Sequence, residues 1–333
     1  MSDFQSEKRV VRDYYEALDA ADDDNITDVL VKFTADNYIW RAFHPFNIQT
    51  EAESVSSIFW QPFRKSIQHV QRRMDVFFAG KNFIDNGDTV WVCSMGHLMG
   101  LFDNPWLGIQ PTDKLIMLRY AEFHKIEDGK ISETAFYFDI PHLMIQAGYQ
   151  PFKNPTAMHL VQPGPETHDA LLFADAPASE GQKTMDVMHA MISDLGTWQS
   201  GLPLEEELAR TWHKDMTWWG PAGIGATYTI ERYAKQHSGP FRAAFTDRSG
   251  TGHIARIAEG HYSGFFGWPN FLAKPSAGFM GLPPSNKLCE FRVIDIYRRE
   301  GKKLKENWIF IDMLHFFKQQ DVDILANLQE SLK

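Results

Sequence analysis

The chain has 333 residues, of which 44% are hydrophobic and 14% aromatic, so it is long enough for about two domains with cores of their own. Its formal net charge is −10 and it has no long basic run, which makes nucleic acid or an anionic membrane a poor partner. Cys93 and Cys289 form no pair motif, so we expect neither a disulfide framework nor a metal site. The charged N-terminus and the lack of a long apolar run predict a cytoplasmic protein without a membrane segment.

The first half of the chain has helical patterns followed by strand patterns. Residues 7–33 predict two helices, residues 38–40 a short strand and residues 51–71 a further helix, from the spacing of their apolar side chains. From 74 to 139 the pattern predicts strands separated by turns, such as the one at 86–88. Helices followed by an antiparallel or mixed sheet indicate an α+β fold.

A change of composition divides the chain. Residues 151–182 are rich in Pro, with Gly, Ser, Ala and Asp. We interpret them as a linker or surface strap between a domain at 1–150 and a second at 183–333. The apolar run at 171–173 predicts that part of this segment docks on a domain.

The second half repeats the first. Residues 129–142 predict a strand running into a helix with an acid at the join, and residues 303–315 repeat this pattern. Asp139 and Asp312 occupy matching positions 173 residues apart, and neighbouring Glu and His residues keep the same offset. A period this long indicates two whole domains in tandem.

Two earlier motifs also recur. Residues 217–219 match 38–40, which pairs Trp219 with Trp40. Gly260-His261 matches Gly96-His97 at an offset of 164, so we expect nine extra residues in the second half, near 271–280.

Asp139 and Asp312 are the main candidates for chemistry. Because side chains alternate along a strand, each Asp shares a face with aromatic residues such as Tyr137 or Phe310. If that face lines a pocket, desolvation raises the pKa of the carboxyl toward the range of a general acid or base. The alternative is that each Asp is a helix N-cap, and both roles can coexist.

Several histidines are further candidates. His97 and His261 lie beside Gly in strand patterns, where each is either a pocket donor or a partly buried histidine at a bulge. His142 and His315 follow the two Asp residues by three positions, in a first helical turn, and either face the same cavity or pack at the surface. His44 is a weaker candidate without a histidine counterpart in the second half.

Two arginines and several tryptophans complete the candidate site. Arg119 and Arg292 are mid-strand and serve either in cross-strand salt bridges or in binding a substrate carboxylate. Glu122 and Asp295 follow them by three residues and therefore belong to the opposite faces of the strands. Tryptophans provide either core or the aromatic walls of a ligand cavity; the candidates are Trp40, Trp219 and Trp308.

These motifs, in this order, resemble the SnoaL-like polyketide cyclase family of the NTF2-like superfamily. The resemblance rests on the turn at 108–114, the stretch at 127–133 and Asp139, with counterparts at 281–287, 303–306 and Asp312. It covers most of both halves and leaves the linker uncovered. It implies one cone per domain, formed by a strongly curved sheet and about three helices around an apolar cavity.

The resemblance also implies a function. In the family, the terminal Asp is an acid/base for cofactor-free aldol closure of a polyketide ester, a role that would fall here to Asp139 and Asp312, assisted by His97 and His261. The expected ligand is a small hydrophobic carbonyl or ester compound, with no cofactor and no metal. The two domains are expected to pack sheet to sheet as an intramolecular pseudo-dimer, with further homo-oligomerisation possible. The alternative function is a non-catalytic binding or structural protein, because this fold serves many functions.

Overall fold

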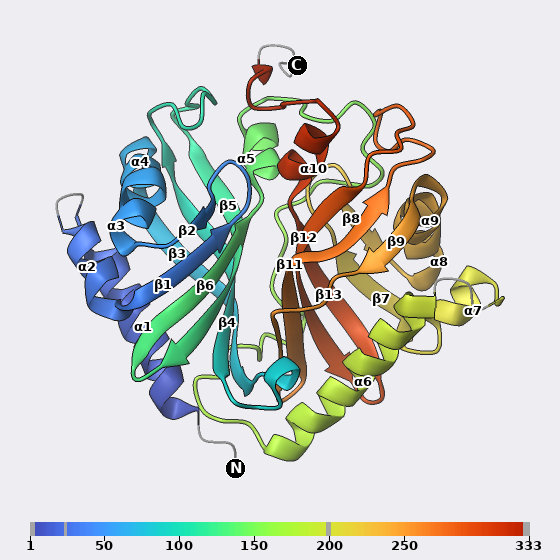
Figure 1. Cartoon of the computed structure of the whole chain (residues 1–333), viewed down its shortest axis with the longest axis horizontal. Coiled ribbons are helices and arrows are strands. Elements are labelled where there is room, and N and C mark those ends of the chain that lie inside the picture. The colour runs from blue at the N-terminus through green and yellow to red at the C-terminus, as the bar shows by residue number, and fades with distance from the viewer. Residues whose placement is uncertain (1–3, 23–24, 198–200, 329–333) are drawn as a thin grey trace.

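The computed structural model describes residues 4–22, 25–197 and 201–328, and the chain forms two cones side by side (Figure 1). In each cone a curved sheet carries helices on its outer face, and the two sheets face each other across the middle of the molecule. The α+β fold with two tandem cones is therefore confirmed.

The N-terminal cone begins with two helices whose buried residues lie on one face, such as Val11, Tyr14 and Leu18 in the first helix. Its helical elements are α1 (Gln5–Ala20), α2 (Ile26–Phe33), α3 (Ala52–Val55), the π-helical turn η1 (Ser56–Trp60), α4 (Gln61–Ser66), the 3-10 turn η2 (Phe83–Asp85) and α5 (Ile140–Gln146). Its strands are β1 (Thr34–Ala42), β2 (Asn47–Gln49), β3 (Ile67–Lys81), β4 (Val90–Phe102), β5 (Leu115–Glu127) and β6 (Lys130–Phe138). The helix predicted at 51–71 ends at Ser66, and Ile67 already begins β3.

The C-terminal cone repeats this order, including a π-helical turn in the matching place. Its helical elements are α6 (Ala178–Thr197), α7 (Leu204–Leu208), α8 (Ile230–Tyr233), η3 (Ala234–Ser238), α9 (Gly239–Ala244) and α10 (Met313–Gln319). Its strands are β7 (Trp212–Trp219), β8 (Ala226–Tyr228), β9 (Thr246–Gly250), β10 (Ala255–Glu259), β11 (Tyr262–Lys274), β12 (Cys289–Glu300) and β13 (Lys303–Ile311).

The two sheets have the same strand order around their centres. The N-terminal sheet runs β2-β1-β6-β5-β4-β3, and the C-terminal sheet runs β10-β11-β12-β13-β7-β8 with β9 also paired to β11. The pairs β1–β6 and β7–β13 are parallel and the other pairs antiparallel, so both sheets are mixed. The long β3 corresponds to β9 and β10 together.

The register of these strands corrects two of the predicted matches. Trp40 lies opposite Thr134 and Trp218 opposite Asn307, so the counterpart of Trp40 is Trp218 and not Trp219. His97 lies opposite Arg119, whereas Arg292 packs over the ring of Trp268, at 3.9 Å.

The predicted match of Gly-His motifs is therefore wrong. His261 precedes β11, and Trp268 takes the place that His97 has in the first cone. The expected nine-residue insertion is absent too, because residues 275–288 connect β11 to β12 and residues 103–114 connect β4 to β5, a difference of two. The two Gly-His sequences resemble each other by chance, because they lie at different positions in the two sheets.

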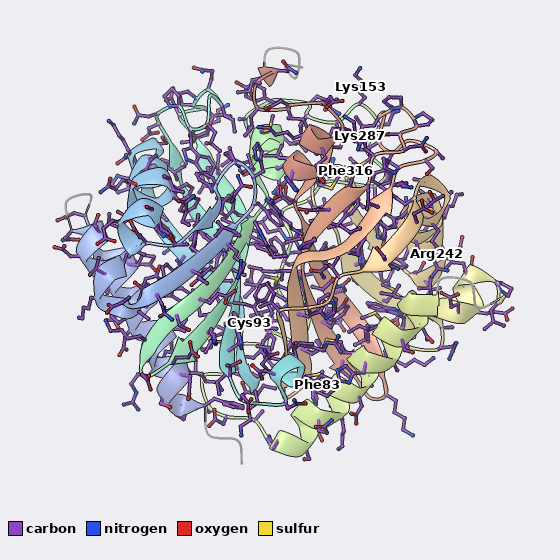
Figure 2. The ribbon with its side chains drawn as sticks, in the orientation of Figure 1. Phe83, Cys93, Lys153, Arg242, Lys287 and Phe316 are labelled. Atoms are coloured by element: carbon purple, nitrogen blue, oxygen red, sulfur yellow. The ribbon has the colours of Figure 1, made fainter. Side chains whose placement is uncertain are left out.

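The domain interface is a second hydrophobic core between the two sheets. It combines residues of β3 to β6, such as Cys93 (Figure 2), with residues of β10 to β13. Its aromatic members are Phe43, Phe78, Trp91, Phe123 and Tyr137 from the first half and Tyr262, Phe266, Trp308 and Phe310 from the second. The expected sheet-to-sheet packing is what the structure has.

The segment at 147–177 joins the cones without a helix or strand of its own. It adds to an edge of each sheet: Met158 bridges Ala226 of β8, and Leu171 bridges Phe77 of β3. Its Asp175 forms a buried ion pair with Lys8 of α1, at 2.9 Å. It therefore holds the outer edges of both cones.

Candidate functional site

Asp139 and Asp312 both lie at the domain interface. Each caps the helix that follows it, since Asp139 Oδ1 accepts from His142 N at 3.0 Å and Asp312 Oδ1 accepts from His315 N at 3.1 Å. The second oxygen of each reaches the other domain: Asp139 Oδ2 accepts from Ala222 N at 2.9 Å, and Asp312 Oδ2 accepts from His44 N at 2.8 Å. His44 and Ala222 are four residues beyond the matched Trp40 and Trp218, so the two contacts are symmetric.

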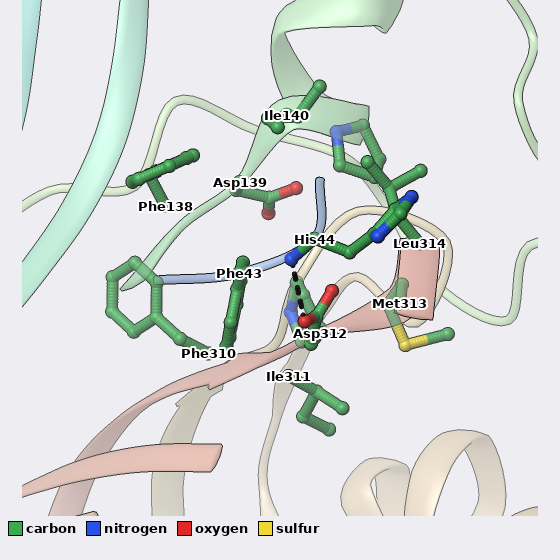
Figure 3. Close-up of a pocket in the computed structure, with 12 residues that line it drawn as sticks. Phe43, His44, Phe138, Asp139, Ile140, Phe310, Ile311, Asp312, Met313 and Leu314 are labelled. Atoms are coloured by element: carbon green, nitrogen blue, oxygen red, sulfur yellow. Dashed lines mark hydrogen bonds between the residues drawn. The ribbon is translucent and has the colours of Figure 1, made fainter. Parts of the chain in front are cut away.

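The two carboxyl groups also line one shared cavity (Figure 3). Its walls are mostly apolar, with Phe43 and Phe310 among them, and its volume of about 10 Å³ is roughly that of one water molecule. The aromatic faces predicted for both Asp residues are present, but they pack against the other sheet and do not line the interior of a cone.

Burial shifts the pKa values of the ionisable groups around this cavity. Desolvation raises the pKa of Asp312 to about 6, against the opposing effect of Arg292 at 3.3 Å. Desolvation lowers the pKa of His315 to about 3, that of His44 to about 4, and that of His142. These histidines are therefore neutral near pH 7.

Arg119 and Arg292 occupy matching places beside the two Asp residues but have different partners. Arg292 Nη1 bonds to Asp312 Oδ2 at 3.3 Å and to Asn47 Oδ1 at 2.8 Å. Arg119 stacks over the Phe310 ring at 3.8 Å and its Nη2 donates to the carbonyl oxygen of Trp219 at 3.1 Å. Its pKa falls to about 9 because the guanidinium is desolvated.

The interface thus brings together most of the residues predicted for the site: Asp139, Arg119, His97, His142 and Trp219 on one side, and Asp312, Arg292, His315 and His44 on the other. Trp308 is also at the interface, where its Nε1 donates to Pro163 O at 3.0 Å. Two predicted residues are elsewhere. Trp40 packs inside the N-terminal cone against Phe59 and Phe136, and His261 is half exposed beside Glu180 of α6.

The interior of the N-terminal cone contains a polar cluster that the sequence did not reveal. Glu122 Oε2 accepts from Tyr15 at 2.6 Å and from Arg72 Nη1 at 2.9 Å, and His124 bonds to Tyr15 at 2.9 Å. Burial pushes the pKa of Glu122 upward, but Arg72 and the hydrogen bonds outweigh it and the net shift is downward. Glu122 is therefore an ionised carboxylate paired with Arg72.

The interior of the C-terminal cone has Asp295 at the position of Glu122. It lies on the same face of β12 as Val293 and Tyr297, and it is 7% exposed. Asn307 Nδ2 donates to it at 2.9 Å, and the Tyr297 hydroxyl is its other hydrogen-bond partner. Desolvation raises the pKa of Asp295 to about 7, because its effect exceeds the lowering by these two bonds and by the charge of Arg119.

Aromatic rings surround this carboxyl group. Trp212 contacts both Tyr297 and Tyr233, and Tyr233 contacts the stacked pair of Trp218 and His237. His237 Nδ1 is buried and has no protein partner among the described residues, and desolvation lowers the pKa of this ring to about 3. Among the described residues, the C-terminal interior therefore holds a protonatable acid, Asp295, and a neutral imidazole, His237, whose Nδ1 has no protein partner.

A cleft lies on the surface of the same cone, beside α9. It has a volume of about 420 Å³ and is lined by residues 154–156, by α9 and by the loop at 277–281. Phe279 of this loop contacts Phe241, Phe245 and Phe316, the last of which is on α10 (Figure 2). This phenylalanine cluster separates the cleft from the deeper aromatic interior.

Neither a metal site nor a membrane-spanning helix is found in the part of the chain that the structure describes. No cluster of His, Cys, Asp or Glu with the geometry of a metal site occurs there. Within the same residues, every helix is too short or too polar to cross a membrane.

Residues 270–320 match the family model of the SnoaL-like polyketide cyclases. The matched stretch contains Asp295 and Asp312, and it confirms the resemblance predicted from the repeated motifs. No curated protein matches the chain.

Similar solved structures correspond to less than half of the chain. A protein from Jannaschia sp. CCS1 named as a SnoaL-like polyketide cyclase is 18% identical with a TM-score of 0.34, covering 42% of this chain and 89% of its own. An NTF2-like protein from Burkholderia thailandensis E264 is 19% identical with a TM-score of 0.31, covering 42% and 95%. TsrD from Streptomyces laurentii is 16% identical with a TM-score of 0.34, covering 44% and 98%.

Proposed function

We propose that the protein is a cofactor-independent acid/base enzyme that acts on a small hydrophobic carbonyl or ester compound in the interior of the C-terminal cone. Asp295 is the proposed acid/base. The observation that carries this proposal is its environment: among the described residues, the buried carboxyl group has an amide and a phenol as hydrogen-bond partners, and it lies among aromatic rings. A group with a pKa of about 7 can both take and return a proton at neutral pH.

The proposed chemistry is removal of a proton from the carbon next to a carbonyl group. Asp295 would accept the proton, and the resulting enolate oxygen would need a hydrogen-bond donor in a dry site. His237 is the candidate donor, because its Nδ1 is buried without a protein partner among the described residues. Return of the proton by Asp295 to the product would complete a cofactor-free cycle, as in an aldol closure or an isomerisation.

The proposed route to this site starts at the 420 Å³ cleft, which has the size of a small-molecule pocket. Phe279 and its neighbours would have to move for a ligand to pass from the cleft to Asp295. An apolar, flat ligand suits these walls, which are aromatic along most of the path.

Asp139 and Asp312, the carboxylates assigned from the family resemblance, are the competing acid/base candidates. Both of their oxygens already accept backbone amides, and the cavity between them has room for about one water. These contacts favour a role in capping helices and joining the domains.

The test is exchange of the α-proton of aryl β-keto esters and diketones in deuterated buffer, followed by NMR. Asp295→Asn should lower the rate by about 10²–10⁴ while leaving the fold intact. Glu122→Asp is the matched change in the other cone and should leave the rate within about threefold. The opposite result would assign the acid/base role to the domain interface. It would consist of full activity in Asp295→Asn and loss of exchange in folded Asp312→Asn or Asp139→Asn.

The alternative is a non-catalytic protein that binds the same class of compound. It predicts saturable binding of these ligands, weakened by filling the cleft with Ala243→Trp, and no exchange above the buffer rate with any of them. The absence of both binding and exchange would contradict both functions.

A further inference from the structure

The segment that joins the two cones packs against the loop that separates the cleft from the interior of the C-terminal cone. This gate loop, residues 277–281, carries Phe279, which packs against Phe241 and Phe245. Residues 154–156 of the joining segment line the same cleft as the gate loop. The joining segment therefore lies on the proposed path of a ligand toward the interior.

The joining segment and the gate loop approach each other closely at two glycines. A Cβ atom on Gly281 would lie 3.1 Å from Lys153 Cβ. A Cβ atom on Gly223 would lie 2.2 Å from Met280 Cε and 2.6 Å from Phe152 Cδ2. Both glycines have a positive φ, a conformation that favours glycine. The lack of a side chain at these two positions lets the segment pack directly beside the gate loop.

Phe152 fixes the joining segment to the aromatic cluster of the C-terminal cone. It is 2% exposed, and its ring centre lies 5.0 Å from that of Phe317 on α10. The preceding residue of α10, Phe316, contacts Phe279 of the gate loop. Phe152 therefore belongs to the same packed group of rings as the gate loop.

Hydrogen bonds to the C-terminal cone begin only at Thr156. Thr156 N donates to Gly223 O at 2.9 Å, and the Thr156 hydroxyl donates to Ile224 O at 2.7 Å. Residues 151–155, in contrast, form no hydrogen bond with either cone in the part of the chain that the structure describes. Loss of the Phe152 ring would therefore release this stretch while Thr156 stays bound.

The N-terminal cone has the reciprocal arrangement. Gly108 matches Gly281 at the offset of 173 and lies in the loop between β4 and β5. A Cβ atom on Gly108 would lie 2.9 Å from Leu328 Cδ1, in the segment that follows α10. The chain that leaves each cone therefore contacts the equivalent loop of the other cone.

We propose that residues 152–156 form a lid that holds the gate loop closed. When the ring of Phe152 leaves its place, the gate loop is released, Phe279 moves aside and a ligand reaches Asp295. The inference rests on the proposed function, since it assigns the control of access to that site. Because the segment comes from α5, the last helix of the N-terminal cone, it also gives that cone a part in the activity of the other.

Amide hydrogen exchange, followed by mass spectrometry, tests the lid without a substrate. The amide of Ala277, at the start of the gate loop, donates to Ala244 O at 3.1 Å, so it is protected while the loop is closed. Phe152→Ala should raise the exchange rate across 277–281 at least about tenfold, because the loop loses the contact that holds it. Unchanged exchange in this loop would overturn the inference.

Leu328→Ala is the matched control in the other cone. It removes the contact at Gly108, so exchange should rise in the loop at 103–114 and stay unchanged at 277–281. A gate loop that responds equally to both variants would indicate a general loss of stability and would contradict a lid at Phe152.

Lys153→Cys combined with Gly281→Cys provides a reversible lock on the lid. The two Cβ atoms would be 3.1 Å apart, close to the roughly 3.5–4.5 Å of a disulfide. The native Cys93 and Cys289 are buried and not disulfide-bonded. Oxidation of the variant should slow α-proton exchange at least about tenfold, and reduction should restore it. A single protein is compared in two states, so the substitutions themselves do not account for the difference.

These outcomes separate the lid from the proposed function. Absence of α-proton exchange in every form of the protein would contradict the proposed function, and the amide exchange of the gate loop would still decide on the lid. Activity that is equal in the oxidised and the reduced variant would overturn the lid and leave the proposed function in place.

Discussion

The two cones hold a carboxyl group at the same strand position in opposite electrostatic surroundings. In the N-terminal cone, Glu122 bonds to Arg72 and Tyr15 and its pKa is lowered. In the C-terminal cone, Asp295 has Asn307 and Tyr297 as partners and its pKa is raised to about 7. Duplication has kept the acid but not its counter-charge.

This difference separates a structural carboxylate from a reactive one. A paired buried carboxylate stays ionised and holds its neighbours in place, while an unpaired one exchanges a proton near neutral pH. The C-terminal cone also has the 420 Å³ cleft on its surface, beside α9. This comparison supports the proposal that the chemistry occurs in the C-terminal cone and that the N-terminal cone is its structural partner.

The largest expected effect comes from breaking the ion pair in the N-terminal cone. Glu122→Gln should destabilise the protein by about 3–5 kcal/mol at pH 8, because it leaves the buried Arg72 without its closest counter-charge. Asp295→Asn should change stability by less than about 1 kcal/mol or increase it, since it removes an unpaired charge. Urea unfolding measures the stability of both variants. Equal losses of stability would contradict the proposed difference between the two cones.

Asp295 should make a contribution of its own to the pH dependence of stability. The pKa of Asp295 is about 7 in the fold against an ordinary 3.8, so the folded state binds the proton more tightly than the unfolded state. The contribution of Asp295 to stability should therefore fall as the pH rises from about 4 to 7, by on the order of 4 kcal/mol, and then level off. Asp312, with a pKa of about 6, adds a smaller change of the same sign. The buried histidines His44, His237 and His315 have lowered pKa values and contribute in the opposite direction.

Comparison with Asp295→Asn isolates this contribution. The variant lacks this contribution, so the difference in the free energy of unfolding between the two proteins should change in favour of the variant by on the order of 4 kcal/mol from pH 4 to 7, as measured by urea unfolding at several pH values. A variant with the same pH profile as the original protein would show that Asp295 is ionised throughout.

Removing the interface carboxylates should have intermediate effects. Asp312→Ala removes a helix cap and an acceptor for His44 N, which together contribute about 2–4 kcal/mol. Asp139→Ala should cost less, because Asp312→Ala also leaves Arg292 without its carboxylate. A larger loss for Asp139→Ala in thermal unfolding would contradict this order.

The smallest effect is expected at His261. Its side chain is 50% exposed and its ionic neighbour is Glu180 at 3.5 Å, on the outer face of the C-terminal cone. His261→Ala should change the free energy of unfolding by less than about 0.5 kcal/mol and leave activity unchanged. A loss of activity would instead support the functional role that the sequence predicted for His261.

The sequence predicted the fold well because its signals are local and repeated. Periodic apolar residues located the helices, and the duplicated strand-to-helix junction at Asp139 and Asp312 located the ends of both sheets. The same alternation placed Glu122 and Asp295 on the faces opposite Arg119 and Arg292.

The site was harder to predict because it depends on which face of a sheet becomes the interior. Asp139 and Asp312 share a face with aromatic residues in either case, but that face joins the domains. In the sequence, Asp295 stood out only because it follows Arg292 by three positions. Its raised pKa arises from desolvation without an ion pair of the kind that Arg72 forms with Glu122, and no sequence motif indicates this difference. Trp268 beside Arg292 likewise follows from strand register, which the Gly-His strings misrepresented.

The most direct test of the account is the pKa of these two carboxyl groups, measured by carbon-13 NMR on protein labelled in Asp and Glu side chains. Asp295→Asn and Glu122→Gln assign the resonances. We predict that the Asp295 signal titrates near pH 7 and that the Glu122 signal remains that of a carboxylate down to at least pH 4.5. An Asp295 carboxyl that is already ionised at pH 5 would contradict the assignment of acid/base chemistry to the C-terminal cone.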